Sequence, residues 1–333
     1  MKPVIFGLSG PELTDDERAF FADARPAGYI LFGRNVETRA QLRALTDSLR
    51  TLEGRDDVAI LVDQEGGRVA RLRPPEWPAF PEGPAFDRLY ERAPMSAIEA
   101  ARVNGHALGL MLAEVGITVD CHPILDVAQA GTTDAIASRA FGSDPMRVAA
   151  LGRATLDGLA SGGVVGVVKH MPGHGRAQVD SHHHLPTVHA SAEELERDIE
   201  PFRTLAHAPM GMTGHIVFPA WDAERPATLS PVVIEQVIRG LIGFDGLLMT
   251  DDIDMKALSG SAGDKAADAI AAGCDLVLDC WARMAEMQDI AARLDDITPR
   301  SRERLDRAMA TPAPTEGDLA ALIDKRDQLL ALA

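Results

Sequence analysis

The chain is short of cysteine and of basic residues. Only three cysteines occur among its 333 residues, namely Cys121, Cys274 and Cys280, too few for a disulfide framework and typical of a reducing compartment. Lys and Arg number 33 against 50 Asp and Glu. The resulting net charge of −17 argues against nucleic acid and anionic membrane surfaces as partners, because both require basic patches.

The sequence also lacks long hydrophobic runs. None reaches the roughly 18 apolar residues that a membrane span requires, and the apolar start at residues 1–7 is too short for a secretory signal. We therefore expect a soluble cytoplasmic protein that contacts no membrane, with a monomer as the default oligomeric state. The apolar fraction of 46% is still large enough for a sizeable core.

Short apolar runs alternate with segments of helical character, a pattern typical of parallel sheets in α/β proteins. The expected strands are 4–8, 28–32, 59–62, 117–121, 164–168, 211–215, 246–250 and 274–278. Expected helices include 15–24, 39–52, 96–114, 145–160, 192–207 and 231–240. Eight such units predict a (β/α)8 TIM-type barrel. An open doubly wound sheet is the alternative, weakened because no G-x-G-x-x-G follows an expected strand.

Two long connections and a polar tail interrupt this rhythm. Residues 73–84 carry five prolines, and residues 121–141 are polar and rich in small side chains. Loops of this length are usually functional or disordered. We expect one domain over residues 1–333, in which about 283–333 form a helical C-terminal extension whose last helix begins near Asp318.

The densest cluster of reactive side chains is K-H-M-P-G-H-G-R-A-Q-V-D-S-H, which runs from Lys169 to His182. Its proline and glycines exclude a helix, so His170 and His174 are not neighbours on one helical face. The cluster directly follows the expected strand 164–168. Barrel enzymes carry their catalytic groups at such strand ends, so a catalytic loop is indicated here.

Three further strings complete a recognisable set. They are V-D-Q-E-G-G-R-V at 62–69, S-R-A-F-G at 138–142 and M-T-D-D at 249–252. Together with the 169–182 string, in this order, they resemble the β-N-acetylhexosaminidase branch of glycoside hydrolase family 3, which includes bacterial glucosaminidases that recycle peptidoglycan fragments. The resemblance spans the chain up to about Cys280.

The resemblance implies the catalytic groups. A retaining glycosidase needs a carboxylate nucleophile and a group that protonates the leaving oxygen. Strand alternation leaves open whether Asp251 or Asp252 faces the barrel mouth; the family pattern chooses Asp251 as nucleophile, and we expect Asp252 to cap the following helix. His182 is implied as general acid/base. Asp180, two residues earlier, projects to the same side of an extended loop and would orient the imidazole.

Sugar hydroxyls are held best by charged hydrogen-bonding groups. The residues implied to bind the terminal sugar are Asp63, Arg71, Arg139, Lys169 and His170. Arg68 and Arg73 lie close enough in sequence to compete with Arg71, and Lys169 could instead be a structural ion-pair partner inside the barrel. His174 is expected to shape its loop, and His215 is a weaker candidate for the pocket wall.

The function implied is that of a retaining exo-β-N-acetylglucosaminidase that releases N-acetylglucosamine from anhydro-muropeptides through a covalent glycosyl-enzyme, without a metal or organic cofactor. One alternative is a metal-dependent barrel hydrolase that uses His170, His174 and residues 182–184 as ligands. A second is a sugar-binding protein that has kept the fold but not the reaction. A third is a two-domain β-glucosidase, for whose second domain no room remains after Cys280.

Overall fold

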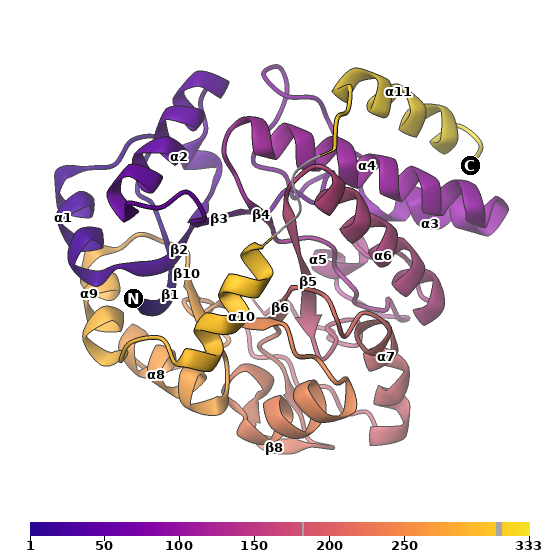
Figure 1. Ribbon diagram of the computed structural model, residues 1–333. Coiled ribbons are helices and arrows are strands. Elements are labelled where there is room, and N and C mark those ends of the chain that lie inside the picture. The colour runs from indigo at the N-terminus through magenta and orange to yellow at the C-terminus, as the bar shows by residue number, and fades with distance from the viewer. Residues whose placement is uncertain (182, 311–314) are drawn as a thin grey trace.

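A closed barrel of parallel strands forms the centre of the computed structural model, which describes residues 1–181, 183–310 and 315–333 (Figure 1). Within these residues eight strands pair in the order β1-β10-β9-β6-β5-β4-β3-β2 and back to β1. Their bounds are β1 (Lys2–Gly7), β2 (Pro26–Leu31), β3 (Ala59–Val62), β4 (Val119–Asp120), β5 (Val165–Met171), β6 (Met210–Thr213), β9 (Leu247–Asp252) and β10 (Leu276–Asp279). Each expected strand is therefore a barrel strand, and the TIM-type fold is confirmed.

Helices surround the barrel. They are α1 (Asp15–Ala24), α2 (Arg39–Glu53), α3 (Gly83–Arg92), α4 (Pro94–Glu114), α5 (Asp134–Ala137), α6 (Pro145–Ser161), α7 (Ala192–Thr204), the π-helical η3 (Val233–Leu241), α8 (Ala262–Ala272), α9 (Met284–Arg293), α10 (Pro299–Met309) and α11 (Leu319–Leu330). Two 3₁₀ turns, η1 (Gly33–Asn35) and η2 (Ala227–Leu229), and an antiparallel hairpin of β7 (Val217–Phe218) and β8 (Asp222–Pro226) lie in the connections.

Local sequence signals explain where several helices begin. Thr14 accepts a hydrogen bond from the Glu17 backbone while the Glu17 carboxylate accepts one from the Thr14 backbone, a capping box that starts α1. Asp144 caps α6, which has a proline in its first turn, where proline costs no hydrogen bond. Thr298 caps α10, and the following Pro299 occupies its first position, where proline is favoured.

The barrel interior is filled by side chains rather than hollow. Ile5, Ile30, Leu61, Val167 and Leu247 from five different strands belong to one buried cluster inside the barrel. A separate set of apolar residues packs between the strands and the helices outside them. A packed interior of this kind leaves the carboxyl ends of the strands as the rigid platform on which polar side chains can be held.

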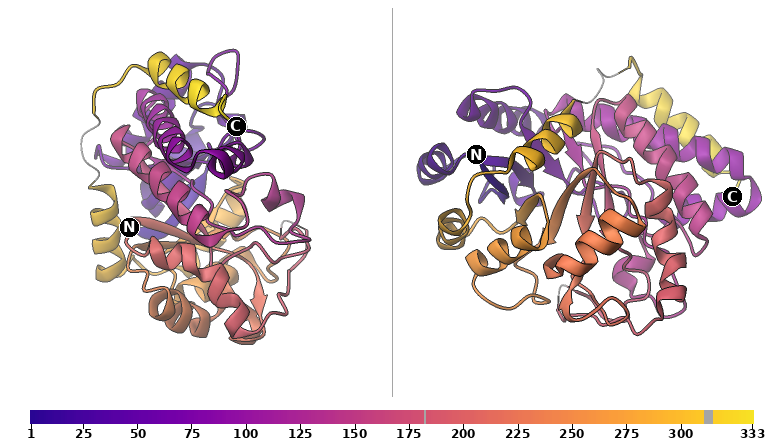
Figure 2. Two further views of the ribbon diagram at one scale, coloured as in Figure 1. Left: turned by 90° about the vertical axis from the view of Figure 1, so that its right-hand side faces the viewer. Right: turned by 60° about the horizontal axis from the view of Figure 1, so that its bottom comes forward.

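The C-terminal extension covers two parts of the barrel. Helix α10 crosses the end where the strands begin, because Arg304 reaches Asp275 at the start of β10 and Asp245 just before β9. Helix α11 lies along α4, where Arg326 donates to Asn104 (3.3 Å); Figure 2 shows it beside α3 and α4 from a second direction. The expected start of the last helix at Asp318 is confirmed, since Asp318 is its N-cap.

Candidate active site

A cavity of about 600 Å³ opens at the carboxyl ends of the barrel strands. Asp63 directly follows β3, Lys169 and His170 lie in β5, and Asp251 lies near the end of β9. Of the predicted site residues, those that line this cavity are Asp63, Arg71, Arg139, Lys169, His170, Asp180 and Asp251. His182, the predicted acid/base, lies outside the described residues. The strand ends and loops thus bring the other seven together from four regions of the chain.

A partly buried carboxylate, Asp63, organises the first pair of cations. Asp63 accepts a hydrogen bond from Lys169 Nζ at 2.9 Å and another from the Arg71 guanidinium at 3.0 Å. Burial alone would raise the pKa of Asp63, but the two positive charges outweigh it and hold the pKa below its ordinary value. Asp63 is therefore ionised at neutral pH and ready to accept hydrogen bonds from hydroxyl groups.

Glu65, which the sequence reasoning did not assign, links the remaining cations. Its carboxylate accepts two hydrogen bonds from Arg139, at 2.8 and 2.6 Å, and lies 2.8 Å from Lys169 Nζ. Although burial opposes ionisation, Arg139 and Lys169 hold the pKa of Glu65 well below its ordinary value. Its place two residues after Asp63 in the 62–69 string, where side chains in extended backbone share a face, was the available signal.

Lys169 connects the two carboxylates. Its side chain is 2% exposed, and its pKa is raised because Asp63 and Glu65 more than compensate for burial. Lys169 is thus an ion-pair partner inside the barrel, one of its two interpretations from the sequence, and it also lines the cavity. Arg71 is distinguished from its neighbour Arg73, which bonds to backbone carbonyls and does not line the cavity.

His170 and the following loop are anchored by a second unassigned carboxylate, Asp126. It lies 2.7 Å from His170 Nδ1 and accepts the His174 backbone N–H at 2.6 Å. Burial would raise the pKa of Asp126, but the contacts with the two histidines lower it. His174 Nε2 lies 3.1 Å from the Ser181 hydroxyl, so His174 holds the loop together, in agreement with its predicted role.

The loop after β5 is pressed against the loop after β4. A Cβ atom at Gly175 would lie only 1.9 Å from the Val127 carbonyl oxygen, so glycine is required for this approach. The Asp180 carbonyl accepts the backbone N–H groups of His183 and His184, and the side chains of Asp180 and His183 line the cavity. The loop therefore extends from the strand end to the rim of the cavity.

The two aspartates at the end of β9 have different surroundings. The Asp252 backbone N–H donates to the Asp251 carboxylate at 2.8 Å. The Asp252 carboxylate accepts the N–H groups of Asp254 (3.2 Å) and Cys280 (3.3 Å), and burial raises its pKa to about 6. The predicted helix cap at Asp252 is wrong, because a turn rather than a helix follows β9 and α8 begins only at Ala262.

His215 does not belong to the wall of the cavity. It is fully buried, where its Nδ1 lies 2.7 Å from the Thr228 hydroxyl and its Nε2 lies 2.9 Å from the Asp252 carbonyl oxygen. It supports the end of β9 from behind, because the neighbouring strand β6 ends just before it. Among the described residues, no three His, Cys, Asp or Glu side chains gather in the way a metal ion would need.

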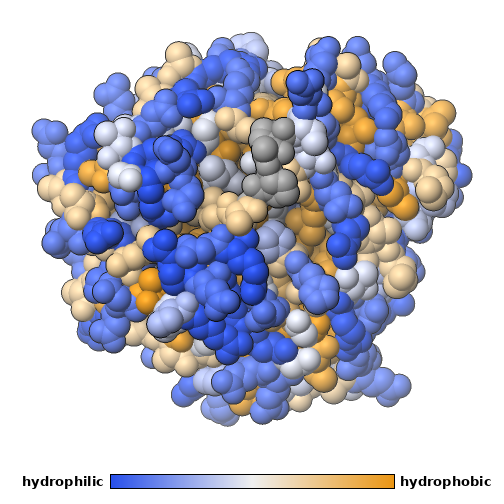
Figure 3. All heavy atoms as spheres, in the orientation of Figure 1, coloured by the Kyte–Doolittle hydropathy of each residue, from blue (hydrophilic) through white to orange (hydrophobic). Residues whose placement is uncertain are grey.

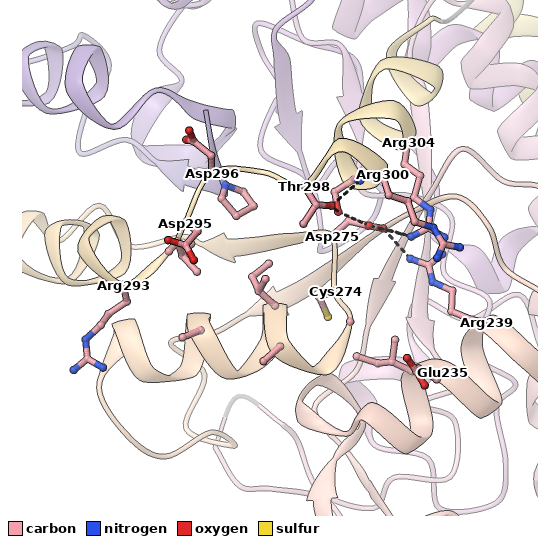
Figure 4. A pocket seen from close by; sticks show the side chains of 18 residues that line it. Glu235, Arg239, Cys274, Asp275, Arg293, Asp295, Asp296, Thr298, Arg300 and Arg304 are labelled. Atoms are coloured by element: carbon pink, nitrogen blue, oxygen red, sulfur yellow. Dashed lines mark hydrogen bonds and ion pairs between the residues drawn. The ribbon is translucent and has the colours of Figure 1, made fainter.

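A larger cavity, of about 770 Å³, lies at the opposite end of the barrel beside α8 and α10 (Figure 4). Three of its charged residues pair with one another: Arg239 and Arg304 both bind Asp275, at 2.8 and 3.1 Å. Ser301 also donates to Asp275, at 2.8 Å. These contacts hold α10 across the end of the barrel where the strands begin. The carboxylates and cations expected for a glycosidase lie in the smaller cavity, at the carboxyl ends of the strands.

Comparison with known proteins decides the family. A family model described as the glycosyl hydrolase family 3 N terminal domain matches residues 5–310. The chain belongs to glycoside hydrolase family 3. A beta-hexosaminidase of Bordetella avium is 36% identical over 95% of this chain and 90% of its own length, and one of Alkalilimnicola ehrlichii is 37% identical over 93% and 89%.

Solved structures of the family agree with the fold. NagZ from Neisseria gonorrhoeae, solved in complex with N-trifluoroacetyl-D-glucosamine, superposes with a TM-score of 0.88 at 30% identity and covers 100% of this chain and 98% of its own. This family 3 chain is therefore a glycoside hydrolase of the β-hexosaminidase type, as the resemblance implies.

In the described part of the chain no helix is long and apolar enough to cross a membrane, and hydrophilic residues cover most of the face seen in Figure 3.

Proposed function

We propose that this family 3 hydrolase is a retaining exo-β-N-acetylglucosaminidase in which Asp251 is the nucleophile. The observation that carries the proposal is the position of Asp251 near the end of β9, in one cavity with the ion-paired Asp63, Lys169 and Arg139. In the order of strands around the barrel, β9 stands opposite β3, the strand that Asp63 follows. A sugar bound by Asp63 can thus extend its anomeric carbon toward Asp251.

The reaction has two steps. Asp251 attacks the anomeric carbon and forms a covalent glycosyl-enzyme while His182 donates a proton to the leaving oxygen. In the second step His182 takes a proton from water, which then attacks the same carbon and releases the sugar with its configuration retained. Asp180 fixes the tautomer of His182, the role that a carboxylate beside a catalytic histidine has in other hydrolases.

The charged groups of the cavity hold the non-reducing sugar. Asp63 accepts hydrogen bonds from hydroxyl groups, while Arg71, Arg139, Lys169 and His170 donate to them. Support comes from the ion pairs that fix these groups before a sugar arrives, because preorganised charges lose little freedom on binding. A single cavity lined by these groups suits one terminal sugar, which agrees with removal of single residues from a chain end.

The substrates that we propose are N-acetylglucosamine-capped anhydro-muropeptides from cell-wall turnover. The similarity to a NagZ structure that contains an N-acylated glucosamine derivative supports the sugar class. We further propose that the enzyme acts in the cytoplasm as a monomer, that residues 1–333 form one domain, and that neither a metal nor an organic cofactor takes part in the reaction.

The test compares release of nitrophenol from 4-nitrophenyl β-N-acetylglucosaminide and from the matching β-glucoside by wild type and Asp251→Ala. We expect turnover of the acetamido sugar alone and its loss in Asp251→Ala. Asp264→Ala, at an exposed carboxylate of α8, is the matched control and should retain full activity. Turnover that survives in a folded Asp251→Ala variant would refute the assignment of the nucleophile.

The covalent step has its own test. In a 5-fluoro derivative of the N-acetylglucosaminide, the fluorine destabilises the oxocarbenium-like transition states and so slows both steps of the reaction. An activated leaving group speeds up the first step alone, so that the covalent intermediate accumulates. Intact-protein mass should rise by one fluorosugar unit, and peptide mapping should place the label on Asp251. Release of the α-anomer as first product, seen by NMR, would contradict retention.

A further inference from the structure

Trp281 is an exposed aromatic side chain at the rim of the catalytic cavity. It follows β10 and is 57% exposed, yet it is one of the residues that line the cavity around Asp251. The other two tryptophans, Trp77 and Trp221, are buried or half-buried. Tryptophan side chains cover a large area and are enriched at interfaces, so a ring left open to water at the mouth of this cavity is suited to ligand contact.

The backbone that carries Trp281 is fastened on both sides. The Cys280 N–H donates to the Asp252 carboxylate at 3.3 Å, and the Cys280 carbonyl accepts a hydrogen bond from Arg34. The residue after the tryptophan, Ala282, has a φ of 56°, one of the few left-handed backbone conformations at a non-glycine residue in the described chain. Such conformations cost free energy and persist where the surroundings impose them.

The side chains around this turn are also held in place. Arg34 donates to the Leu8 carbonyl at 2.7 Å, and its guanidinium lies over the Phe32 ring with 4.9 Å to the ring centre. Arg71 lies over the same ring at 5.1 Å, so the hydroxyl-binding side of the cavity and the Trp281 turn share a support. Trp281 is therefore presented to the cavity from a fixed base rather than from a loose loop.

The position of Trp281 relative to the two ends of a bound sugar indicates what it contacts. The groups proposed to bind hydroxyls come from β5 and from the loops after β3 and β4, whereas Asp251, which would attack the anomeric carbon, comes from β9, opposite β3 in the barrel. β10 is one of the two strands that pair with β9. In the displacement at the anomeric carbon the leaving group departs on the face turned away from Asp251, so the aglycone extends out through the mouth of the cavity, where the exposed Trp281 ring stands.

We propose that the Trp281 ring is a stacking platform for the aglycone, and that it selects leaving groups with a flat apolar face, such as the C–H face of a second pyranose ring. This proposal rests on the proposed glycosidase function. An indole ring can bury a large apolar area at a small cost in conformational freedom, and offset stacking adds to that gain. The choice between leaving groups then arises outside the pocket for the terminal sugar. Among the described residues, Trp281 is the one exposed aromatic ring on the rim next to β9, the strand that carries the nucleophile.

The test uses two substrates that differ only in the aglycone. N,N′-diacetylchitobiose has a second sugar, and N-acetyl-β-glucosaminyl fluoride has a leaving group of one atom that cannot stack. For Trp281→Ala we expect kcat/KM on the disaccharide to fall about tenfold, which corresponds to about 1.4 kcal/mol, while kcat/KM on the fluoride stays within about twofold. Trp281→Phe should restore most of the loss.

Leu241→Ala is the matched control. Leu241 is also an exposed apolar residue, with an exposed fraction of 47%. It is the last residue of η3 and precedes β9, so it lies away from the strand ends that carry the site. The variant should leave both substrates unchanged. Equal losses on both substrates in Trp281→Ala, or no loss on the disaccharide, would overturn the stacking proposal and leave the glycosidase function intact. If wild type hydrolysed neither substrate, the proposed function would fail and this inference with it.

A binding measurement gives a second readout. In the inactive Asp251→Asn variant, the exposed Trp281 should dominate quenching of tryptophan fluorescence by acrylamide. The disaccharide should protect against quenching, whereas free N-acetylglucosamine, which has no aglycone, should not. Equal protection by both sugars would place Trp281 against the terminal sugar instead and would overturn the proposal.

Discussion

Substitution of Glu65 by glutamine tests whether the charges of the cavity act as one network. Glu65 is 6% exposed and is shared between Arg139 and Lys169. Glutamine has the same shape and can still accept one hydrogen bond, so the change removes the charge with little loss of packing. Lys169 would keep Asp63 as its partner, but the Arg139 guanidinium would lose its bidentate carboxylate.

The expected cost follows from the burial of the partners. Arg139 and Lys169 side chains are 11% and 2% exposed, so water cannot replace the lost carboxylate. Breaking a buried ion pair by removing one partner typically costs about 3–5 kcal/mol. The retained amide places Glu65→Gln at the lower end, and about 3 kcal/mol corresponds to a fall in Tm of roughly 4 °C for a chain of this size.

The pH dependence of this cost has a definite sign. The pKa of Glu65 is held well below its ordinary value in the folded protein, so its contribution to stability is fully present above the unfolded-state pKa of about 4.3. The contribution is lost as the pH falls from there through the folded-state pKa. The difference in free energy of unfolding between wild type and Glu65→Gln should thus be constant from pH 7 to pH 5 and shrink below about pH 4.

Urea denaturation at several pH values provides the measurement. Glu99→Gln is the control, because Glu99 pairs with Lys325 at 2.5 Å on the surface, where an ion pair contributes about 1 kcal/mol or less. If Glu65→Gln were no more destabilising than Glu99→Gln, or if its effect grew on acidification, the network would not stabilise the fold in the way argued.

Three further outcomes are expected. Gly175→Ala, whose Cβ would collide with the Val127 carbonyl, should lower kcat on the nitrophenyl N-acetylglucosaminide at least about tenfold, whereas Gly33→Ala, which has open space, should not. Burial raises the pKa of Asp120 to about 8, so the folded protein keeps a proton on this side chain that the unfolded chain releases above about pH 4. Asp120→Asn should therefore become more stable relative to wild type as the pH rises from about 4 to about 8. A difference in free energy of unfolding that stays constant over this range in urea denaturation would contradict this. Prolonged incubation with EDTA should leave turnover unchanged, and a loss restored by a divalent cation would point to the metal-dependent alternative.

The positions of the strands could be predicted because each one is a short apolar run followed by polar or small residues. The strand β3 matches its expected bounds, and α1 does as well. The helices α3 and α8 were not predicted, because α3 directly follows a proline-rich loop and α8 is rich in alanine, with Ile270 as its one large apolar residue. The short β4, with two residues in place of the expected five, ends where its chain turns into the 121–141 connection.

The partners of the site residues could not be predicted. Glu65 and Arg139 are 74 residues apart in sequence, and Asp126 and His170 are 44 residues apart. Motif strings identify which side chains stand at strand ends, but which carboxylate meets which cation depends on the order of strands around the barrel. In that order β3 and β5 are separated only by the short β4, and this proximity lets Lys169 reach Asp63 and Glu65.

This pairing changes what each residue can be said to contribute. The resemblance assigns Asp63, Arg71, Arg139 and Lys169 one by one to sugar binding, yet none of them is held by the backbone alone. Each takes its position from an opposite charge, and Glu65 completes the set. Because coupled residues do not contribute additively, the loss of any one would be felt at its partners as well as at a bound sugar. The rigidity of this side of the cavity is therefore a property of the five charges together, and it faces the strand end where Asp251, the proposed nucleophile, lies.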